Sequence, residues 1–170
     1  MKTNKTEEIV QIIEQNKGLI YKVVNAYCSD VHEQEDLTQE IILQIIKAYE
    51  KFDYKVKVTT WMYRIALNVS ISQYRKIKSR QKYILPMPEN LVKVADDSVC
   101  EENEELVQLK AFIQELPPLN RAILIMFLDG NNHTEISEAV GISVSNVGTK
   151  ISRIKQQLKK KFNQQKNELR

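Results

Sequence analysis

The sequence predicts an all-α protein built from two small helical modules. Only four of its 170 residues are glycine and four are proline, while 42% are hydrophobic and 28% are charged, which is typical of a folded helical chain. Apolar residues recur at helical spacing in both halves, and an acidic stretch containing Pro86 and Pro88 separates the halves. We therefore predict a first module at 1–83, a flexible acidic linker at 84–98 and a second module at 99–170.

Three helices are expected in the first module. The first spans about residues 6–29, with Gly18 as a weak point at which it can break. The second spans about residues 33–52, with two overlapping sets of apolar positions on one side. The third spans about residues 61–83, and one of the threonines at 59–60 is expected to cap it.

The second module contains the pattern of a helix-turn-helix. After a helix at about 99–115, the segment 116–119 (Leu-Pro-Pro-Leu) opens another helix, and 134–136 (Thr-Glu-Ile) opens a third. The turn at 140–143 (Val-Gly-Ile-Ser) leads into a long basic helix at about 144–162. A short helix, a tight turn containing glycine and a second helix with one apolar stripe together indicate this motif.

The last helix has two distinct faces. Spacings of four, three and four residues place its apolar positions on one buried face: Val147, Ile151, Ile154 and Leu158. The opposite face carries side chains that can reach base edges and phosphates: Ser145, Thr149, Ser152, Arg153, Gln156 and Lys160. This arrangement indicates DNA as the partner of the helix.

Charge is unevenly distributed along the chain. The formal net charge of +3 does not by itself indicate a nucleic-acid binder. From Val144 onward, however, Glu168 is the only acidic residue among many basic ones, and between Pro86 and Leu106 Lys93 is the only basic residue among many acidic ones. Such segregation suggests separate functional zones rather than a uniformly solvated surface.

Several classes of function are disfavoured. The N-terminal sequence lacks the apolar run of a signal peptide, and no segment approaches a membrane span. Cys28 and Cys100 cannot form a CxxC metal pair and are interpreted as reduced thiols of a cytoplasmic protein. His32 and His133 lie at expected helix starts, and no glycine-rich phosphate loop or nucleophile beside a base is present. We expect no enzymatic activity, metal, cofactor or small-molecule substrate.

Two polar surfaces are predicted in the first module. On its second helix, side chains three or four residues apart lie side by side: Asp36, Gln39, Glu40 and Leu43. On its third helix, another face is formed by Arg64, Asn68, Ile71 and Arg75. An ordinary solvated surface would explain the acidic face as well as an interface would.

An aromatic loop precedes the third helix. Phe52 and Tyr54 in this loop, with Trp61 at the helix start, suit stacking on the bases of single-stranded nucleic acid, while the basic residues that follow suit its phosphates. Core packing is the alternative explanation for these rings, and for Trp61 alone it is the favoured one.

The order of these motifs closely resembles the extracytoplasmic-function (ECF, group IV) sigma factors of bacterial RNA polymerase. The resemblance covers about residues 6–83 and 100–162. It rests on Asp36-Leu37-x-Gln39-Glu40, Phe52, Trp61-Met62-Tyr63-Arg64-Ile65-Ala66-x-Asn68 and Arg75-Lys76, followed by the acidic linker, Leu116-Pro117-Pro118 and the helix-turn-helix. Each motif alone is weak, but two ordered sets in one short chain are specific.

The resemblance implies a sigma-70 family protein that binds core RNA polymerase and directs promoter-specific initiation, with a region 2 domain at 1–83 and a region 4 domain at 99–170. One set of residues would bind the clamp coiled coil of the largest polymerase subunit: Asp36, Leu37, Gln39, Glu40 and Leu43. A second set would hold the −10 element as it melts, with a flipped base captured in the loop: Phe52, Tyr54, Lys57, Trp61, Arg64, Asn68, Arg75 and Lys76. A third set would recognise the −35 duplex: Ser145, Asn146, Thr149, Lys150 and Arg153.

The resemblance also implies partners. Core RNA polymerase and promoter DNA are expected, and so is an anti-sigma factor, because family members are often held inactive by one. The alternative function is a stand-alone helix-turn-helix regulator of transcription. It would explain residues 116–162 but not the motifs between Asp36 and Arg75.

Overall fold

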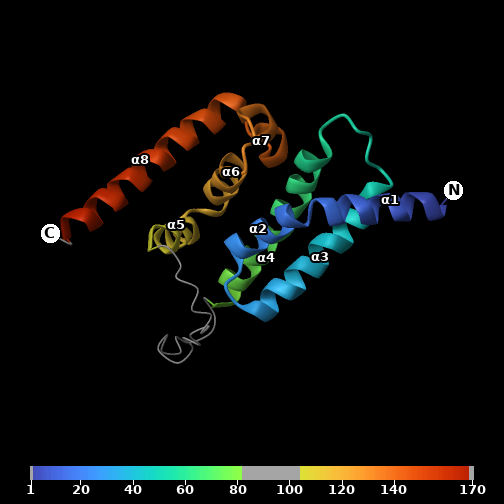
Figure 1. Cartoon of the computed structure of the whole chain (residues 1–170), viewed down its shortest axis with the longest axis horizontal. Coiled ribbons are helices and arrows are strands. Elements are labelled where there is room, and N and C mark those ends of the chain that lie inside the picture. Colours follow the sequence, from blue (N-terminus) through green and yellow to red (C-terminus); the bar gives the residue numbers. More distant parts are fainter. Residues whose placement is uncertain (1, 82–103, 169–170) are drawn as a thin grey trace.

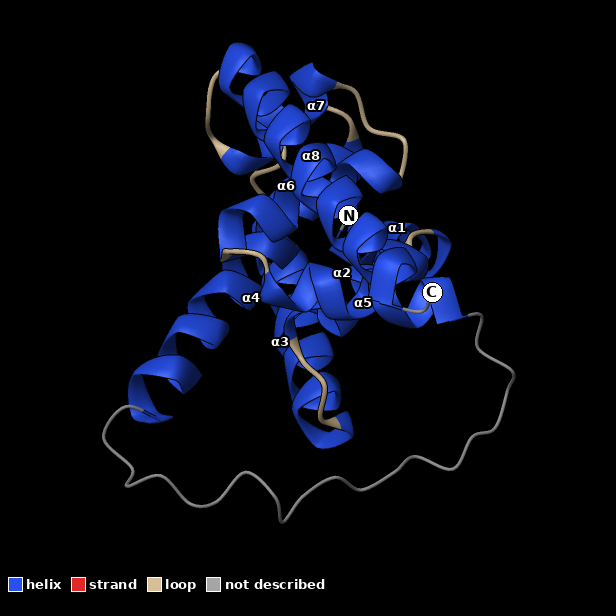
Figure 2. Cartoon of the chain, turned by 90° about the vertical axis from the view of Figure 1, so that its left-hand side faces the viewer, coloured by secondary structure: helices blue, strands red, loops and turns tan. Residues whose placement is uncertain are grey.

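The computed structural model describes residues 2–81 and 104–168, which are helical apart from short loops (Figures 1 and 2). The first module comprises α1 (Lys2–Gln15), α2 (Lys17–Tyr27), α3 (Val31–Tyr49) and α4 (Val58–Gln81). The second comprises α5 (Glu104–Glu115), α6 (Pro118–Leu128), α7 (His133–Val140) and α8 (Val144–Glu168). The predicted all-α class is confirmed. The predicted linker, the N-terminal end of the helix predicted at 99–115 and Cys100 lie outside the described residues.

The first predicted helix is two helices, α1 and α2. The break lies at Asn16, two residues before the predicted weak point, and Gly18 is inside α2. The side-chain amide of Asn16 donates a hydrogen bond to the carbonyl oxygen of Ile12 (2.8 Å). Because asparagine side chains compete in this way for backbone groups, they favour helix ends over helix interiors.

The helices α3 and α4 begin with different signals. Asp30 caps α3, and its carboxylate accepts a hydrogen bond from the backbone N–H of Glu33 (3.0 Å). The predicted threonine cap of the next helix is wrong. The N–H of Trp61 already bonds to the carbonyl of Lys57 (3.0 Å), so α4 starts at Val58 and Thr60 is buried inside it.

The predicted helix-turn-helix is present. Asn132 and Glu135 form a capping box at the start of α7, and Gly141 ends α7 in the left-handed conformation (φ 75°). The hydroxyl of Ser137 donates to the carbonyl of Ile142 across the turn (2.5 Å). The Ser143 hydroxyl then accepts from the N–H of Asn146 (3.2 Å) and caps α8.

The two modules share one hydrophobic core. Buried residues of α2, α3 and α4, such as Val23 and Met62, belong to the same cluster as Ile123 of α6, Ile136 of α7 and Val147 of α8. The reason lies in α6, where every residue from Arg121 to Met126 is buried. A helix that is apolar around most of its circumference needs neighbours on several sides, and α6 obtains them from both modules (Figure 1).

Candidate polymerase and DNA interfaces

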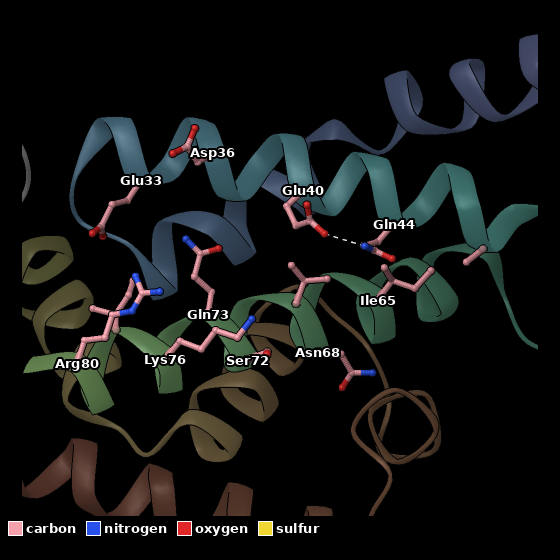
Figure 3. Close-up of a pocket in the computed structure, with 13 residues that line it drawn as sticks. Glu33, Asp36, Glu40, Gln44, Ile65, Asn68, Ser72, Gln73, Lys76 and Arg80 are labelled. Atoms are coloured by element: carbon pink, nitrogen blue, oxygen red, sulfur yellow. Dashed lines mark hydrogen bonds between the residues drawn. The ribbon is translucent and has the colours of Figure 1, made fainter.

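An open groove of about 760 Å³ runs between α3 and α4 (Figure 3). Its α3 side is acidic, with Glu33, Asp36 and Glu40, and its α4 side is basic, with Lys76 and Arg80. The Glu40 carboxylate accepts a hydrogen bond from the Gln44 amide (2.7 Å). The groove thus brings together residues that the sequence analysis had placed in separate polymerase-binding and DNA-binding sets.

The acidic face of α3 is exposed, with one exception. Asp36, Gln39 and Glu40 are exposed, and Leu43 is 43% exposed. Leu37 is fully buried, because one residue step along a helix turns the side chain by about 100° from Asp36 towards the core. Leu37 therefore packs in the core of this structure, and a polymerase contact by it stays a prediction. Ile46 extends this surface, since it lies three residues after Leu43 and is 40% exposed. The motif positions do not include it.

The aromatic residues between α3 and α4 form a connected set of rings. Trp61 is buried and stacks on Phe52 with ring centroids 4.5 Å apart. Core packing, the explanation favoured for Trp61, describes its place in this structure, and a contact of Trp61 with DNA stays a prediction. Phe52 is half-buried, whereas Tyr54 is exposed and its ring centroid lies 4.5 Å from that of Phe52.

Two residues of the predicted −10 set, Lys57 and Arg64, contact α7 of the second module. The Arg64 guanidinium donates from Nε and Nη2 to the backbone carbonyl of Glu138 on α7 (3.1 and 2.7 Å). Lys57 forms an ion pair with Glu135, and this contact lowers the pKa of the Glu135 carboxyl and raises that of the Lys57 ammonium. Asn68, Arg75 and Lys76 are exposed on the remainder of α4.

Asp129, at the end of α6, joins the two modules. Its carboxylate pairs with Lys22 of α2 and accepts a hydrogen bond from the Tyr63 hydroxyl of α4 (2.5 Å). Partial burial alone would raise the pKa of Asp129, but the hydrogen bonds from Lys22 and Tyr63 hold it below its usual value. The pKa of the Tyr63 hydroxyl is raised mainly by its burial and also by the neighbouring Asp129 carboxylate. The hydroxyl therefore keeps its proton and donates it to the hydrogen bond.

Arg121 is the buried cation of the same interface, with 2% of its surface exposed. Its guanidinium donates to the carbonyl of Ala26 in the first module (3.0 Å) and to those of Leu116 (3.1 Å) and Gln114. It also lies over the rings of Tyr27 and Tyr74, 5.1 and 5.0 Å from their centroids. No motif or spacing in the sequence marks Arg121 as an interface residue.

The predicted −35 face of α8 is largely exposed. Ser145, Asn146, Thr149 and Arg153 are exposed on it. Lys150 is half-buried instead, and its ammonium donates to the side chain of Asn120 on α6 (3.3 Å). The predicted apolar stripe is confirmed, with three positions buried and one half-buried: Val147, Ile151, Ile154 and Leu158.

Neither a clustered metal site nor a membrane span is found in the part of the chain that the structure describes. Within residues 2–81 and 104–168, no group of three His, Cys, Asp or Glu side chains is placed to hold a metal ion. No helix in those ranges is both long and apolar enough to cross a membrane. Cys28 is buried, and burial, with smaller contributions from Glu33 and Asp30, raises the pKa of its thiol.

Comparison with known protein families assigns both modules. Residues 12–80 match the model of sigma-70 region 2, and residues 106–158 match that of sigma-70 region 4. The fold and these matches define a protein of the sigma-70 class. The chain is also 30% identical to the ECF RNA polymerase sigma factor SigW of Bacillus subtilis, over 95% of this chain and 92% of SigW. It therefore belongs to the ECF sigma factors of the sigma-70 family, as the order of motifs predicted.

A further relative agrees with this assignment, and two solved structures share the fold. The ECF sigma factor SigM of Bacillus subtilis is 27% identical over 88% of this chain and 91% of SigM. CnrH, solved in complex with the cytosolic domain of CnrY, superposes with a TM-score of 0.68 over 93% of this chain and 89% of CnrH. The sigma factor RpoE of Bartonella quintana, solved with the anti-sigma factor NepR, superposes with a TM-score of 0.69 over 91% of this chain and 96% of RpoE. Both structures are 16% identical in sequence, so they support the fold alone.

Proposed function

We propose that this sigma factor is a group IV member that acts in the cytoplasm. It binds polymerase and promoter DNA through three separate surfaces. The exposed face of α3 docks on core RNA polymerase, the aromatic loop and α4 hold the melted −10 strand, and α8 recognises the −35 duplex. Residues 1–83 act as the region 2 domain, 99–170 as the region 4 domain and 84–98 as the linker. One observation carries the proposal: a single chain presents both an exposed reading face on a helix-turn-helix and a separate acidic and apolar face on α3.

The proposed mechanism involves binding energy and no covalent chemistry. Unstacking a base costs a few kcal/mol, and capture of the extruded base together with phosphate neutralisation can offset that cost. Exposed cations on α4, such as Arg75 and Lys76, are suited to the phosphates of the separated strand. We propose that the chain has no catalytic site, cofactor or small-molecule substrate of its own.

A stand-alone helix-turn-helix regulator accounts for less of the structure. It would use α7 and α8 but would leave the exposed Leu43 and Ile46, beside Asp36 and Glu40, without a role. Exposed apolar side chains within a charged surface are typical of a protein interface. This surface favours a factor that recruits polymerase.

Run-off transcription tests the proposal. Bacterial core polymerase is assayed with and without the full chain on a pool of promoter fragments, and the transcript ends are mapped. Start sites that appear only when the chain is added support a sigma factor and reveal its −35 and −10 elements. Duplex binding without core association or new transcripts would instead establish the stand-alone regulator.

The α3 face gives a prediction about polymerase affinity. Changing Asp36→Ala together with Glu40→Ala should weaken binding to core polymerase by about tenfold or more, because both carboxylates are removed from one docking surface. Fluorescence anisotropy of the labelled full chain with core measures this affinity. Glu7→Ala together with Glu14→Ala, which removes two exposed carboxylates from α1 instead, is the control. Equal affinities for the Asp36 and Glu40 double variant and the wild type would refute the assignment of this face.

The α8 face gives a prediction about promoter binding. Arg153→Ala should weaken binding of the full chain to −35 duplex by about tenfold, and the slope of log K against log salt should fall by about one if Arg153 contacts a phosphate. Titrations at several salt concentrations measure both quantities. Lys159→Ala removes an exposed cation from another side of the same helix and should have a smaller effect. An Arg153 variant that keeps wild-type affinity at every salt concentration would exclude the contact.

We also propose that an anti-sigma factor binds this chain. A groove of about 580 Å³ lies between α2, α5 and α6, with the exposed side chains of Tyr21 and Leu128 along it. An amphipathic helix placed there would contact both modules at once. Tyr21→Asp with Leu128→Asp should then relieve inhibition by a cognate anti-sigma factor in the run-off assay. Unchanged inhibition would place the inhibitor on another surface.

A further inference from the structure

We propose that Glu8 and Tyr49 are positioning residues that hold the Tyr54 ring ready to receive an extruded base of the −10 strand. The inference rests on the proposed function of the aromatic loop and adds two residues to it. Neither residue was expected from the sequence to act in DNA binding. Both act through Tyr54, and neither needs to touch DNA.

A chain of hydroxyl contacts fixes the end of the Tyr54 side chain. The Tyr54 hydroxyl donates to Oε1 of Glu8 (3.2 Å) and lies 2.7 Å from the hydroxyl of Tyr49, which is then the donor to Tyr54. Tyr49 is itself rigid, because it is only 6% exposed and its ring packs near Phe52 and Trp61. Glu8 belongs to α1, so the loop is anchored from two helices.

The backbone of the loop is also held in an unusual conformation. Tyr54 has a φ of 57°, and among the described residues it is the only one other than glycine with a positive φ. Bulky residues rarely adopt this left-handed conformation, and such strained positions gather at functional sites. The preceding residue, Asp53, accepts a hydrogen bond from the N–H of Lys55 (3.2 Å) and pairs with its ammonium (2.7 Å), which closes a turn around Tyr54.

The result is a series of rings that leads from the core to the surface. Trp61 is buried, Phe52 stacks on it, and the Tyr54 ring lies against Phe52 at an interplanar angle of 47°, with 57% of the surface of Tyr54 exposed. An extruded base can extend this series at Tyr54, since stacking on aromatic rings tolerates any base. A ring that is already fixed loses less conformational freedom on binding than a freely rotating one. Glu8 and Tyr49 therefore favour capture by ordering Tyr54 in advance.

The test uses holoenzyme assembled from core polymerase and the full chain. With wild-type protein, 2-aminopurine is moved through the −10 element, and the position with the largest fluorescence rise identifies the extruded base. The rate of open-complex formation is then measured for Tyr49→Phe, which keeps the ring and removes the hydroxyl, and for Glu8→Ala. Both rates should fall by about tenfold. Glu8→Gln, whose amide oxygen can still accept the hydrogen bond, should restore most of the rate.

A template with an abasic site at the extruded position distinguishes two roles of Glu8 and Tyr49. They either order Tyr54 for base capture or merely stabilise the fold. On that template, wild type, Tyr49→Phe and Glu8→Ala should all form open complexes at similar rates, because no base remains to be captured. Glu7→Ala, the same chemical change as Glu8→Ala at the neighbouring exposed glutamate of α1, is the matched control and should behave as wild type on both templates.

Two results would overturn the proposal. Either the variants open the intact template as fast as wild type, or their defect is equally large on the abasic template. Failure of the proposed function looks different. In that case the wild-type holoenzyme itself yields no new start site, or no 2-aminopurine position responds.

Discussion

Arg121→Met should lower the free energy of unfolding by about 3 kcal/mol, because buried carbonyl groups that lose their donor cost about 1–3 kcal/mol each. The substitution keeps an unbranched, largely apolar side chain but removes the guanidinium and with it every donor to Ala26, Leu116 and Gln114. It also removes the cation between the rings of Tyr27 and Tyr74. Urea denaturation followed by circular dichroism measures the change. Arg153→Met, at an exposed arginine, is the control and should stay within about 0.5 kcal/mol of wild type.

The Arg121 variant also tests how strongly the modules depend on each other. Arg121 bonds to the first module through Ala26 and to the second through Leu116, so its loss should weaken the contact between modules as well as the second module itself. We expect the unfolding transition to broaden, because a shared core normally makes two modules unfold as one. A variant with wild-type stability and a single sharp transition would show that the apolar contacts of α6 suffice without the arginine.

Features that depend on neighbouring residues could be predicted from the sequence. The helix-turn-helix follows from the segment 134–136 and the turn at 140–143, where Glu135 and Gly141 act within a few residues of their own position. The stripe on α8 follows from helical periodicity alone, and the structure confirms it. The start of α4 differs from the prediction, because the N–H of Trp61 bonds to the backbone carbonyl of Lys57 and the helix begins before the predicted threonine cap.

Features that depend on distant residues could not be predicted in the same way. The contacts of Lys22 with Asp129 and of Lys57 with Glu135 join residues 107 and 78 positions apart, and nothing in the local sequence selects these partners. The family resemblance likewise names motif positions without distinguishing those that touch a partner from those that support the fold. Leu37 and Trp61 illustrate this, because both are motif positions that are buried in the core here.

Asp129→Asn combined with Glu135→Gln should raise the affinity of the free chain for single-stranded −10 DNA by about tenfold. The ion pairs with Lys22 and Lys57 favour the docked arrangement of the two modules, in which Lys57 and Arg64 contact α7. When only a fraction of molecules has its modules separated and can bind DNA, the apparent affinity for DNA is reduced by that fraction. Weakening the contact between the modules increases the fraction, so the apparent affinity for the single strand rises. Gln at position 135 can keep the capping box of α7, because its amide oxygen still accepts from Asn132.

A fluorescently labelled −10 strand, titrated with the full chain in the absence of polymerase, measures this gain. Glu138→Gln is the matched control, because it removes the same charge from α7 while Arg64 contacts only the backbone of residue 138. Affinity for −35 duplex should not change in any of these variants, since the reading face of α8 is exposed in the docked arrangement. A double variant that binds the single strand no better than wild type would show that the contacts of Lys57 and Arg64 with α7 do not limit access.

The charges of this interface also indicate what can open it. The pKa values of Asp129 and Glu135 are both held below their usual range, so their ion pairs contribute to docking at pH values above about 4.5 and are lost only as the pH falls through the lowered pKa values. Near neutral pH both carboxylates are ionised, and acidification within the physiological range leaves them so. We therefore expect that a partner which binds the separated modules better than the docked ones, rather than acidification, opens this interface. Core polymerase is suited to this role, because the proposed docking face on α3 remains exposed while Lys57 and Arg64 are engaged by α7.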